Sequence, residues 1–173
     1  MLSQIEVTDL LRQEVPAAGP ILSVYLNVDQ ARQDNLNGGF ALPLKNQLRA
    51  IEGSISTQAE RKALRAAAAH LSGFLDGYKP EGKTLCLFCN AEGIFWQENL
   101  LVPLESHIHW GNRPYFQPMV EIQDEFERYA VILTDRQRAR LFTVHLGKIE
   151  EEQDAFAPEE VRKFDASGKD QMW

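Results

Sequence analysis

Hydrophobic positions divide the chain into stretches with strand patterns and stretches with helix patterns. Ile21–Val28 and Thr84–Cys89 are nearly continuous apolar runs rich in β-branched and aromatic residues, which is typical of buried strands. The segments 42–51 and 57–75 instead repeat apolar residues at helical spacing, and the second opens with a capping box at Thr57–Glu60. The pattern therefore predicts two successive helices between two buried strands.

Three further segments complete this first pattern. A polar turn with a glycine separates the 84–89 strand from a second strand at 94–98, and another strand is expected at 106–110. A proline opens a helical stretch over 114–126. The order of strand, two helices, three strands and helix predicts an α/β (α+β) fold, with a mixed β-sheet and packed helices, as an N-terminal domain over residues 1–126.

The sharpest local pattern lies at 129–147. Tyr129–Leu133 is expected to be a buried strand and Ala139–Val144 its partner, so the segment predicts a β-hairpin with an arginine-rich turn. This hairpin would open a second domain over 127–173. Apolar residues become sparse towards the C-terminus and charged ones common, so we expect the tail 150–173 to be flexible.

Composition places the chain among globular proteins. It has 173 residues, 44% apolar and 25% charged. The apolar runs are far shorter than the roughly 20 residues that span a bilayer, and the N-terminus lacks a secretory pattern, so we expect a cytoplasmic protein without a membrane partner. A net charge of -7 argues against bulk binding of nucleic acid and leaves room for a local basic patch.

Cysteine and histidine pairs do not predict a metal site. Cys86 and Cys89 form a C-x-x-C pattern, but residues three apart in a strand point to opposite faces. They are better interpreted as two small buried residues. His107 and His109 would share a strand face, yet two ligands are too few for a metal and no third is evident. We therefore expect no metal and no cofactor.

Arg136, Arg138 and Arg140 are the most informative polar residues. In extended chain they project to one side, and three guanidinium groups together make a phosphate-binding surface. The alternative is a solvated turn whose arginines are neutralised by Asp135 and nearby glutamates, and spacing alone favours neither. The chain has no glycine-rich phosphate loop and no nucleophile elbow, so an ordinary enzyme site is not expected.

Three stretches in order resemble one known family. Leu22–Asp29, Leu87–Gly93 and above all Tyr129–Ile149 resemble the bacterial relatives of the archaeal and eukaryotic class-I release factors and of the ribosome-rescue protein Pelota. The resemblance covers residues 20–150. It implies that the hairpin begins a ribonuclease-H-like middle domain, which would need about 100 further residues, so the chain is expected to be a fragment of a longer protein.

The resemblance also indicates which family motifs have changed. The peptide-releasing Gly-Gly-Gln loop would correspond to Gly168–Gln171, where Gly168 and Gln171 remain as degenerate catalytic candidates and the second glycine is missing. Peptidyl-tRNA hydrolysis is thus left open for a longer form and not expected of this chain. The stop-codon motifs would fall at Ser54–Thr57, which lacks a lysine, and near His109–Phe116, so stop-codon reading is not expected.

Two functions from different classes follow. The first is a ribosome-associated factor related to translation termination, rescue or quality control, whose Arg136, Arg138 and Arg140 contact ribosomal RNA or tRNA. The second is a non-enzymatic protein-interaction module, which the acidic pI near 5.1 favours. An unpaired hairpin edge can also pair with a second copy of the chain, which leaves a homodimer open.

Overall fold

The computed structural model describes residues 19–135 and 138–156, with only the backbone described over 150–156. Its contacts divide the chain into two compact units, Met1–Phe126 and Glu127–Trp173. The elements are β1 (Ile21–Asn27), the 3-10 segment η1 (Gln33–Ala41), α2 (Leu42–Ser54), α3 (Gln58–Gly77), β2 (Thr84–Asn90), β3 (Gly93–Leu100), β4 (His107–Gly111), α4 (Gln117–Glu125), β5 (Tyr129–Thr134), β6 (Arg138–His145) and β7 (Lys148–Phe156). Helices and two sheets together confirm the predicted α+β class.

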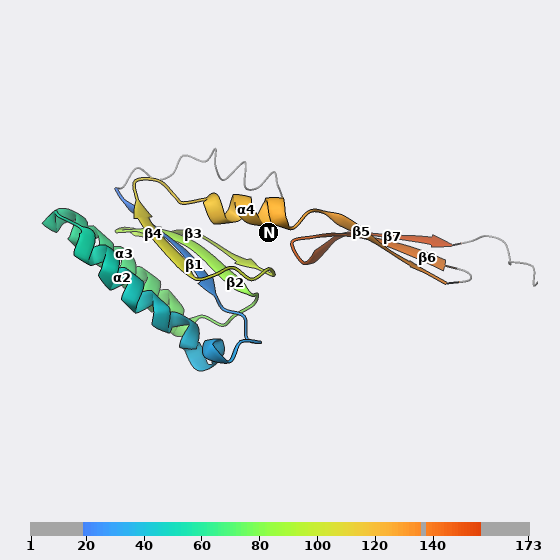
Figure 1. Ribbon diagram of the computed structural model, residues 1–173, viewed down its shortest axis with the longest axis horizontal. Helices are drawn as coiled ribbons and strands as arrows, with labels where there is room; N and C mark the ends of the chain where they lie inside the picture. Colours follow the sequence, from blue (N-terminus) through green and yellow to red (C-terminus); the bar gives the residue numbers. More distant parts are fainter. Residues whose placement is uncertain (1–18, 136–137, 157–173) are drawn as a thin grey trace, which may run out of the picture. The chain divides into compact units, whose positions relative to one another are not determined.

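The sheet of the first unit has the strand order β3-β2-β1-β4, and each neighbouring pair is antiparallel. The predicted mixed sheet is therefore wrong in its strand directions. A single helix between two neighbouring strands lets the second strand run parallel to the first. Here two helices, α2 and α3, lie between β1 and β2, so the chain reverses once more and β2 enters antiparallel to β1 (Figure 1).

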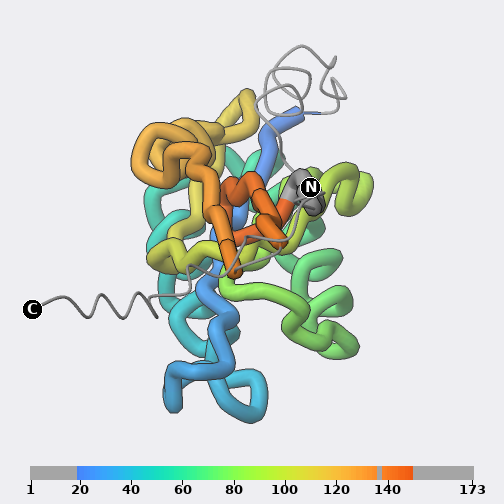
Figure 2. The backbone as a smooth tube through the Cα atoms, turned by 90° about the vertical axis from the view of Figure 1, so that its right-hand side faces the viewer, coloured from blue at the N-terminus to red at the C-terminus, as the bar shows by residue number. Residues whose placement is uncertain are grey.

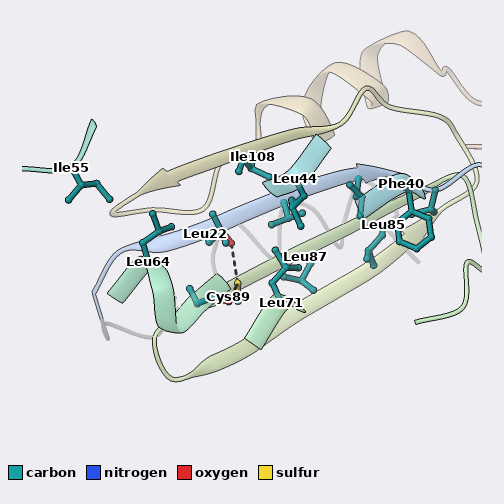
Figure 3. Close-up of a cluster of buried hydrophobic side chains, with 14 residues drawn as sticks. Leu22, Phe40, Leu44, Ile55, Leu64, Leu71, Leu85, Leu87, Cys89 and Ile108 are labelled. Atoms are coloured by element: carbon teal, nitrogen blue, oxygen red, sulfur yellow. Dashed lines mark hydrogen bonds between the residues drawn. The ribbon is translucent and has the colours of Figure 1, made fainter. Parts of the chain in front are cut away.

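Alternating side chains of β1 and β2 build a core on each face of this sheet. On one face α2 and α3 cover the strands (Figure 1), and a single apolar cluster joins them. Figure 3 shows Leu22, Leu87 and Cys89 pointing from the strands towards Leu64 and Leu71 of α3. The other members are Val24, Leu26, Val28, Phe40, Leu44, Ile55, Ala67, Leu85 and Ile108.

The opposite face carries α4 (Figure 1), which buries Met119 and Ile122. Phe116, just before α4, packs edge-on against Phe88 of β2 with ring centroids 5.2 Å apart. Covered on both faces, β1 and β2 are buried at every position, as the apolar runs predict. The trace of β1, blue in Figure 2, runs through the middle of this unit.

The helix ends follow local capping chemistry. Thr57 is the N-cap of α3, and its Oγ1 accepts a hydrogen bond from the Glu60 backbone N–H at 3.3 Å, which confirms the first half of the predicted capping box. A proline occupies the first turn of both α2 and α4. No helix within residues 19–135 and 138–156 is both long and apolar enough to cross a membrane.

The second unit contains an antiparallel sheet of order β5-β6-β7. The predicted hairpin is confirmed by the pairing of Tyr129 with Val144 through to Thr134 with Ala139. A tight turn at Leu146 and Gly147, both with positive φ (49° and 77°), then starts β7. Residues 150–156 belong to the tail that the sequence predicts to be flexible, and their backbone pairs with β6. Residues 157–173 lie outside the described part.

The residues of β5 are more exposed than their apolar sequence pattern predicts. Tyr129–Leu133 is predicted to be buried, yet Tyr129, Ile132 and Leu133 are 56%, 64% and 55% exposed. The prediction of burial is wrong because the described part of the second unit consists of strands alone. Without a packed helix, an apolar sheet face stays open to solvent.

Candidate functional site

The tip of the β5–β6 hairpin is held by Asp135. Its backbone N–H donates to the Arg138 carbonyl at 2.9 Å, and its Oδ1 accepts from the Arg138 N–H at 2.8 Å. Such a side-chain bond to the backbone stabilises a tight turn and fixes where the next strand starts. The sequence therefore places Arg138 at the beginning of β6. Arg136 lies outside the described residues.

Arg138 and Arg140 alternate along β6, so they share one face of the strand, and both are exposed. The Arg140 guanidinium carbon lies 5.2 Å from the centre of the Phe142 ring, a cation–π contact that orients the group. Both arginines have interaction partners, and Arg140 pairs in register with Asp154 of β7. The hairpin thus presents two exposed guanidinium groups that also have interactions within the chain, and both interpretations from the sequence keep support.

A cleft of about 390 Å³ lies beside the turn between α2 and α3. It joins the Ser54–Ser56 turn to the Ile108–Trp110 stretch of β4, the two places to which the family resemblance assigns decoding motifs. Trp110 Nε1 donates to Glu60 Oε1 at 3.0 Å across its wall. The full lining is Ile51, Ser54, Ile55, Ser56, Glu60, Ile108, His109 and Trp110. Its fixed charge is a carboxylate, so this cleft does not favour phosphate.

A second cleft, of about 290 Å³, lies next to the same turn and has a different character. Arg49, Glu52, Gly53 and Arg61 line it. The Arg61 Nε and Nη2 atoms donate to the Ile55 carbonyl at 2.9 and 2.7 Å, which fixes the guanidinium plane. Sequence reasoning missed this site, because its arginines come from two helices and form no motif along the chain.

The two histidines of β4 share a face of this edge strand, as their spacing predicts. The Tyr115 ring stacks on His109 with centroids 4.7 Å apart and lies 5.5 Å from His107. Tyr25 Oη donates to the Tyr115 carbonyl, and Tyr115 N–H donates to Ser23 Oγ at 3.0 Å. Within the described residues, no three histidine, cysteine or acidic side chains gather as a metal site.

The cysteines agree with their interpretation as buried residues of a strand. Both lie in β2 and are buried, with Cys89 in the helix-covered core and Cys86 paired with Tyr25 in the register. Burial raises the pKa of Cys86 and raises that of Cys89 to about 12. The Cys89 thiol donates weakly to the carbonyls of Leu22 (3.8 Å, Figure 3) and Ala67 (3.7 Å). Both thiols therefore stay protonated and unreactive at neutral pH.

The predicted catalytic candidates Gly168 and Gln171 lie outside the described residues, so the geometry of that loop stays a prediction. Of the predicted site residues, the structure brings Arg138 and Arg140 together on one strand face. The structure also shows two clefts beside the α2–α3 turn. The sequence analysis did not predict these clefts; it noted only that Ser54–Thr57 lacks a lysine.

Comparison with known proteins gives one family match and several distant structural likenesses. An archaeal protein of 18% identity covers 91% of this chain and 47% of its own, with a TM-score of 0.48. The archaeal translation termination factor aRF1, at 17% identity, covers 91% and 46% with a TM-score of 0.49. The chain thus spans about half the length of these structures. No curated protein matches the sequence.

The family match is to the bacterial archaeo-eukaryotic release factor family 10, over residues 114–172. This stretch contains α4 and the whole β5-β6-β7 sheet, including Arg138 and Arg140. The chain is therefore related to the bacterial relatives of the archaeal and eukaryotic release factors, and the relation rests on its residues 114–172.

Proposed function

We propose that this chain is part of a cytoplasmic, ribosome-associated factor related to translation termination, rescue or quality control. The family match over residues 114–172 is the observation that carries the proposal. Residues 127–173 would be the start of the release-factor-like, ribonuclease-H-like middle domain, and the first unit its N-terminal domain. The turn at Ser54–Thr57 has no lysine and lies beside a cleft whose fixed charge is Glu60, which supports a role without stop-codon reading.

The RNA contact in this proposal is the arginine face of β6. Arg138 and Arg140 are exposed on one side of a strand, and guanidinium groups bind phosphate through paired N–H donors. The proposal also includes Arg136, two residues before Arg138 in the sequence. The proposed partners are ribosomal RNA or tRNA, reached by local positive charge on a chain of net charge -7.

Ribosome co-sedimentation tests this function. The full chain should pellet with ribosomes through a sucrose cushion, more at low salt than at high salt. The double variant Arg138→Gln/Arg140→Gln should bind about tenfold more weakly and show a shallower salt slope. Arg113→Gln/Arg128→Gln removes the same charge elsewhere and should bind like the wild type. If the wild type pellets with neither idle nor stalled ribosomes, the proposal is wrong.

A protein-interaction module is the second candidate, and the exposed apolar side chains of β5 favour it. In that case the arginine variants would leave RNA affinity flat, and Ile132→Ser would weaken a protein complex instead. The same edge strand could pair two copies of the chain, which sedimentation velocity would detect as a concentration-dependent dimer.

A third proposed activity is peptidyl-tRNA hydrolysis by a longer form of the protein. The proposal assigns the candidate loop to Gly168–Gln171, which keeps the glutamine and one glycine. In a longer form, Gln171→Ala should abolish peptide release while ribosome binding persists. Release that is unchanged by this substitution would remove Gln171 from the mechanism.

A further inference from the structure

Helix α4 has one face on the sheet and one face towards solvent. Met119 and Ile122 are buried on the sheet side. The exposed residues recur every three or four positions, as one side of a helix requires, and we call them the outer face: Gln117, Val120, Glu121, Asp124 and Glu125. The outer face thus carries three carboxylates around an apolar side chain, Val120, which is 42% exposed.

The charges of α4 oppose the preferences of an isolated helix. Carboxylates stabilise a helix near its N-terminus and basic groups near its C-terminus. In α4 the first turn has no acidic residue and the last turn no basic one, while Asp124 and Glu125 lie at the C-terminal end. Glu121 and Glu125 are also four residues apart, a spacing at which like charges repel.

The fold of the first unit does not use these charges. In the described part of the chain, neither Asp124 nor Glu125 forms a side-chain hydrogen bond or an ion pair. Glu121 is held in place instead: Tyr115 Oη donates to Gln117 Oε1 at 2.8 Å, and Gln117 Nε2 donates to Glu121 Oε1 at 2.7 Å. Residues that break a local rule without a gain in stability are typical of a binding surface.

The two helical layers of the first unit have opposite charge. The layer of α2 and α3, on the other face of the sheet (Figure 1), has five basic and three acidic residues, whereas α4 has three acidic residues and no basic one. A cationic ligand is therefore attracted to α4 and repelled by the other layer.

The ends of this chain do not supply such a ligand. Residues 1–18 contain three acidic residues and one basic one, and residues 157–173 contain four acidic residues and three basic ones. Both segments are acidic overall, so charge complementarity favours a segment of another protein.

We propose that the outer face of α4 docks a lysine- and arginine-rich segment of another protein. The basic side chains would meet Glu121, Asp124 and Glu125. An apolar side chain between them would cover Val120, a contact that a hydrated metal ion does not make. This inference goes beyond the ribosomal function and does not depend on it, so either can fail alone.

Fluorescence anisotropy with a labelled peptide of four Lys-Lys-Leu repeats tests this surface on the full chain. Asp124→Asn/Glu125→Gln should weaken binding at low salt about fivefold, since two opposing charges are lost. The thermal midpoint of the free chain should rise by about 1–3 °C, because unfavourable charges leave the helix end. Weaker binding by a more stable protein cannot arise from misfolding. Val120→Ser should weaken binding about twofold with no change in charge.

Asp34→Asn/Asp76→Asn is the matched control. Both residues are exposed carboxylates outside α4, in η1 and in the last turn of α3, so the variant removes the same charge elsewhere. Its affinity should stay within about 1.5-fold of the wild type. Equal losses in the two double variants, or no peptide binding by the wild type, would overturn the proposal. So would spermine binding that requires Asp124 and Glu125 while the peptide does not bind.

Discussion

Strands β2 and β5 are both largely apolar, but β2 is buried and β5 is exposed. Both are runs of apolar residues, yet β2 is buried at every position, whereas every β5 residue except the partly buried Val131 is exposed. The difference lies in what covers them: α2 and α3 lie on one face of β2 and α4 on the other, and the described part of the second unit has no helix. An apolar run thus predicts a strand, and other elements decide whether it is buried.

The largest expected effect comes from shortening matched apolar side chains in the two sheets. Leu87→Ala in β2 should lower the free energy of unfolding of the first unit by about 2–5 kcal/mol, because it opens a cavity in a closed core. Ile132→Ala in β5, with its side chain 64% exposed, should change stability by about 0.5 kcal/mol or less. Urea titration followed by tryptophan fluorescence and by circular dichroism measures both. Equal losses would contradict the contrast between the sheets.

The free energy of unfolding should depend on pH through the two buried thiols of β2. The folded state holds Cys89 protonated up to a pKa of about 12, against an ordinary value of 9.0, so the unfolded state loses its proton first. Stability is then intact below pH 9 and falls as the pH rises above it, by about 1 kcal/mol for each thiol by pH 10. Cys89→Ala should reduce this pH-dependent fall by its own share, whatever it does to stability at neutral pH. A fall of unchanged size would contradict the assignment.

A smaller effect is expected at the turn that separates the two clefts. Thr57→Ala removes the acceptor for the Glu60 N–H at the start of α3 and should cost about 1 kcal/mol of stability. Thr57→Ser keeps a hydroxyl and should recover most of that loss. Thermal unfolding of the three proteins at equal concentration gives the comparison, and identical midpoints would show that the cap does not stabilise the helix.

Local patterns predicted the elements well because their causes are local. Continuous apolar runs located the buried strands and the hairpin, and helical spacing located both long helices. The structure adds that Asp135 holds the turn before β6. Strand direction was missed, since it depends on counting the crossovers between β1 and β2. The two helices predicted between these strands already imply antiparallel neighbours, and the predicted mixed sheet did not take this into account.

The clefts were missed for a different reason. Arg49 and Arg61 belong to separate helices, and Trp110 reaches Glu60 across fifty residues of chain. The capping-box pattern even assigns the Glu60 carboxylate to the N-terminus of its own helix, whereas it accepts from Trp110. These residues come together only when the sheet and helices pack, so their spacing along the sequence does not predict the contact.

Hydrogen–deuterium exchange of the full chain, alone and with ribosomes, tests the central claim most directly. Alone, the amides of β1 and β2 should exchange slowly and those of β5 and β6 quickly, because, among the residues that the structure describes, elements cover both faces of the first sheet only. Added ribosomes should slow exchange across β5 and β6, where Arg138 and Arg140 lie. Equal protection of both sheets in the free chain, or exchange in β5 and β6 that ribosomes leave unchanged, would contradict the account.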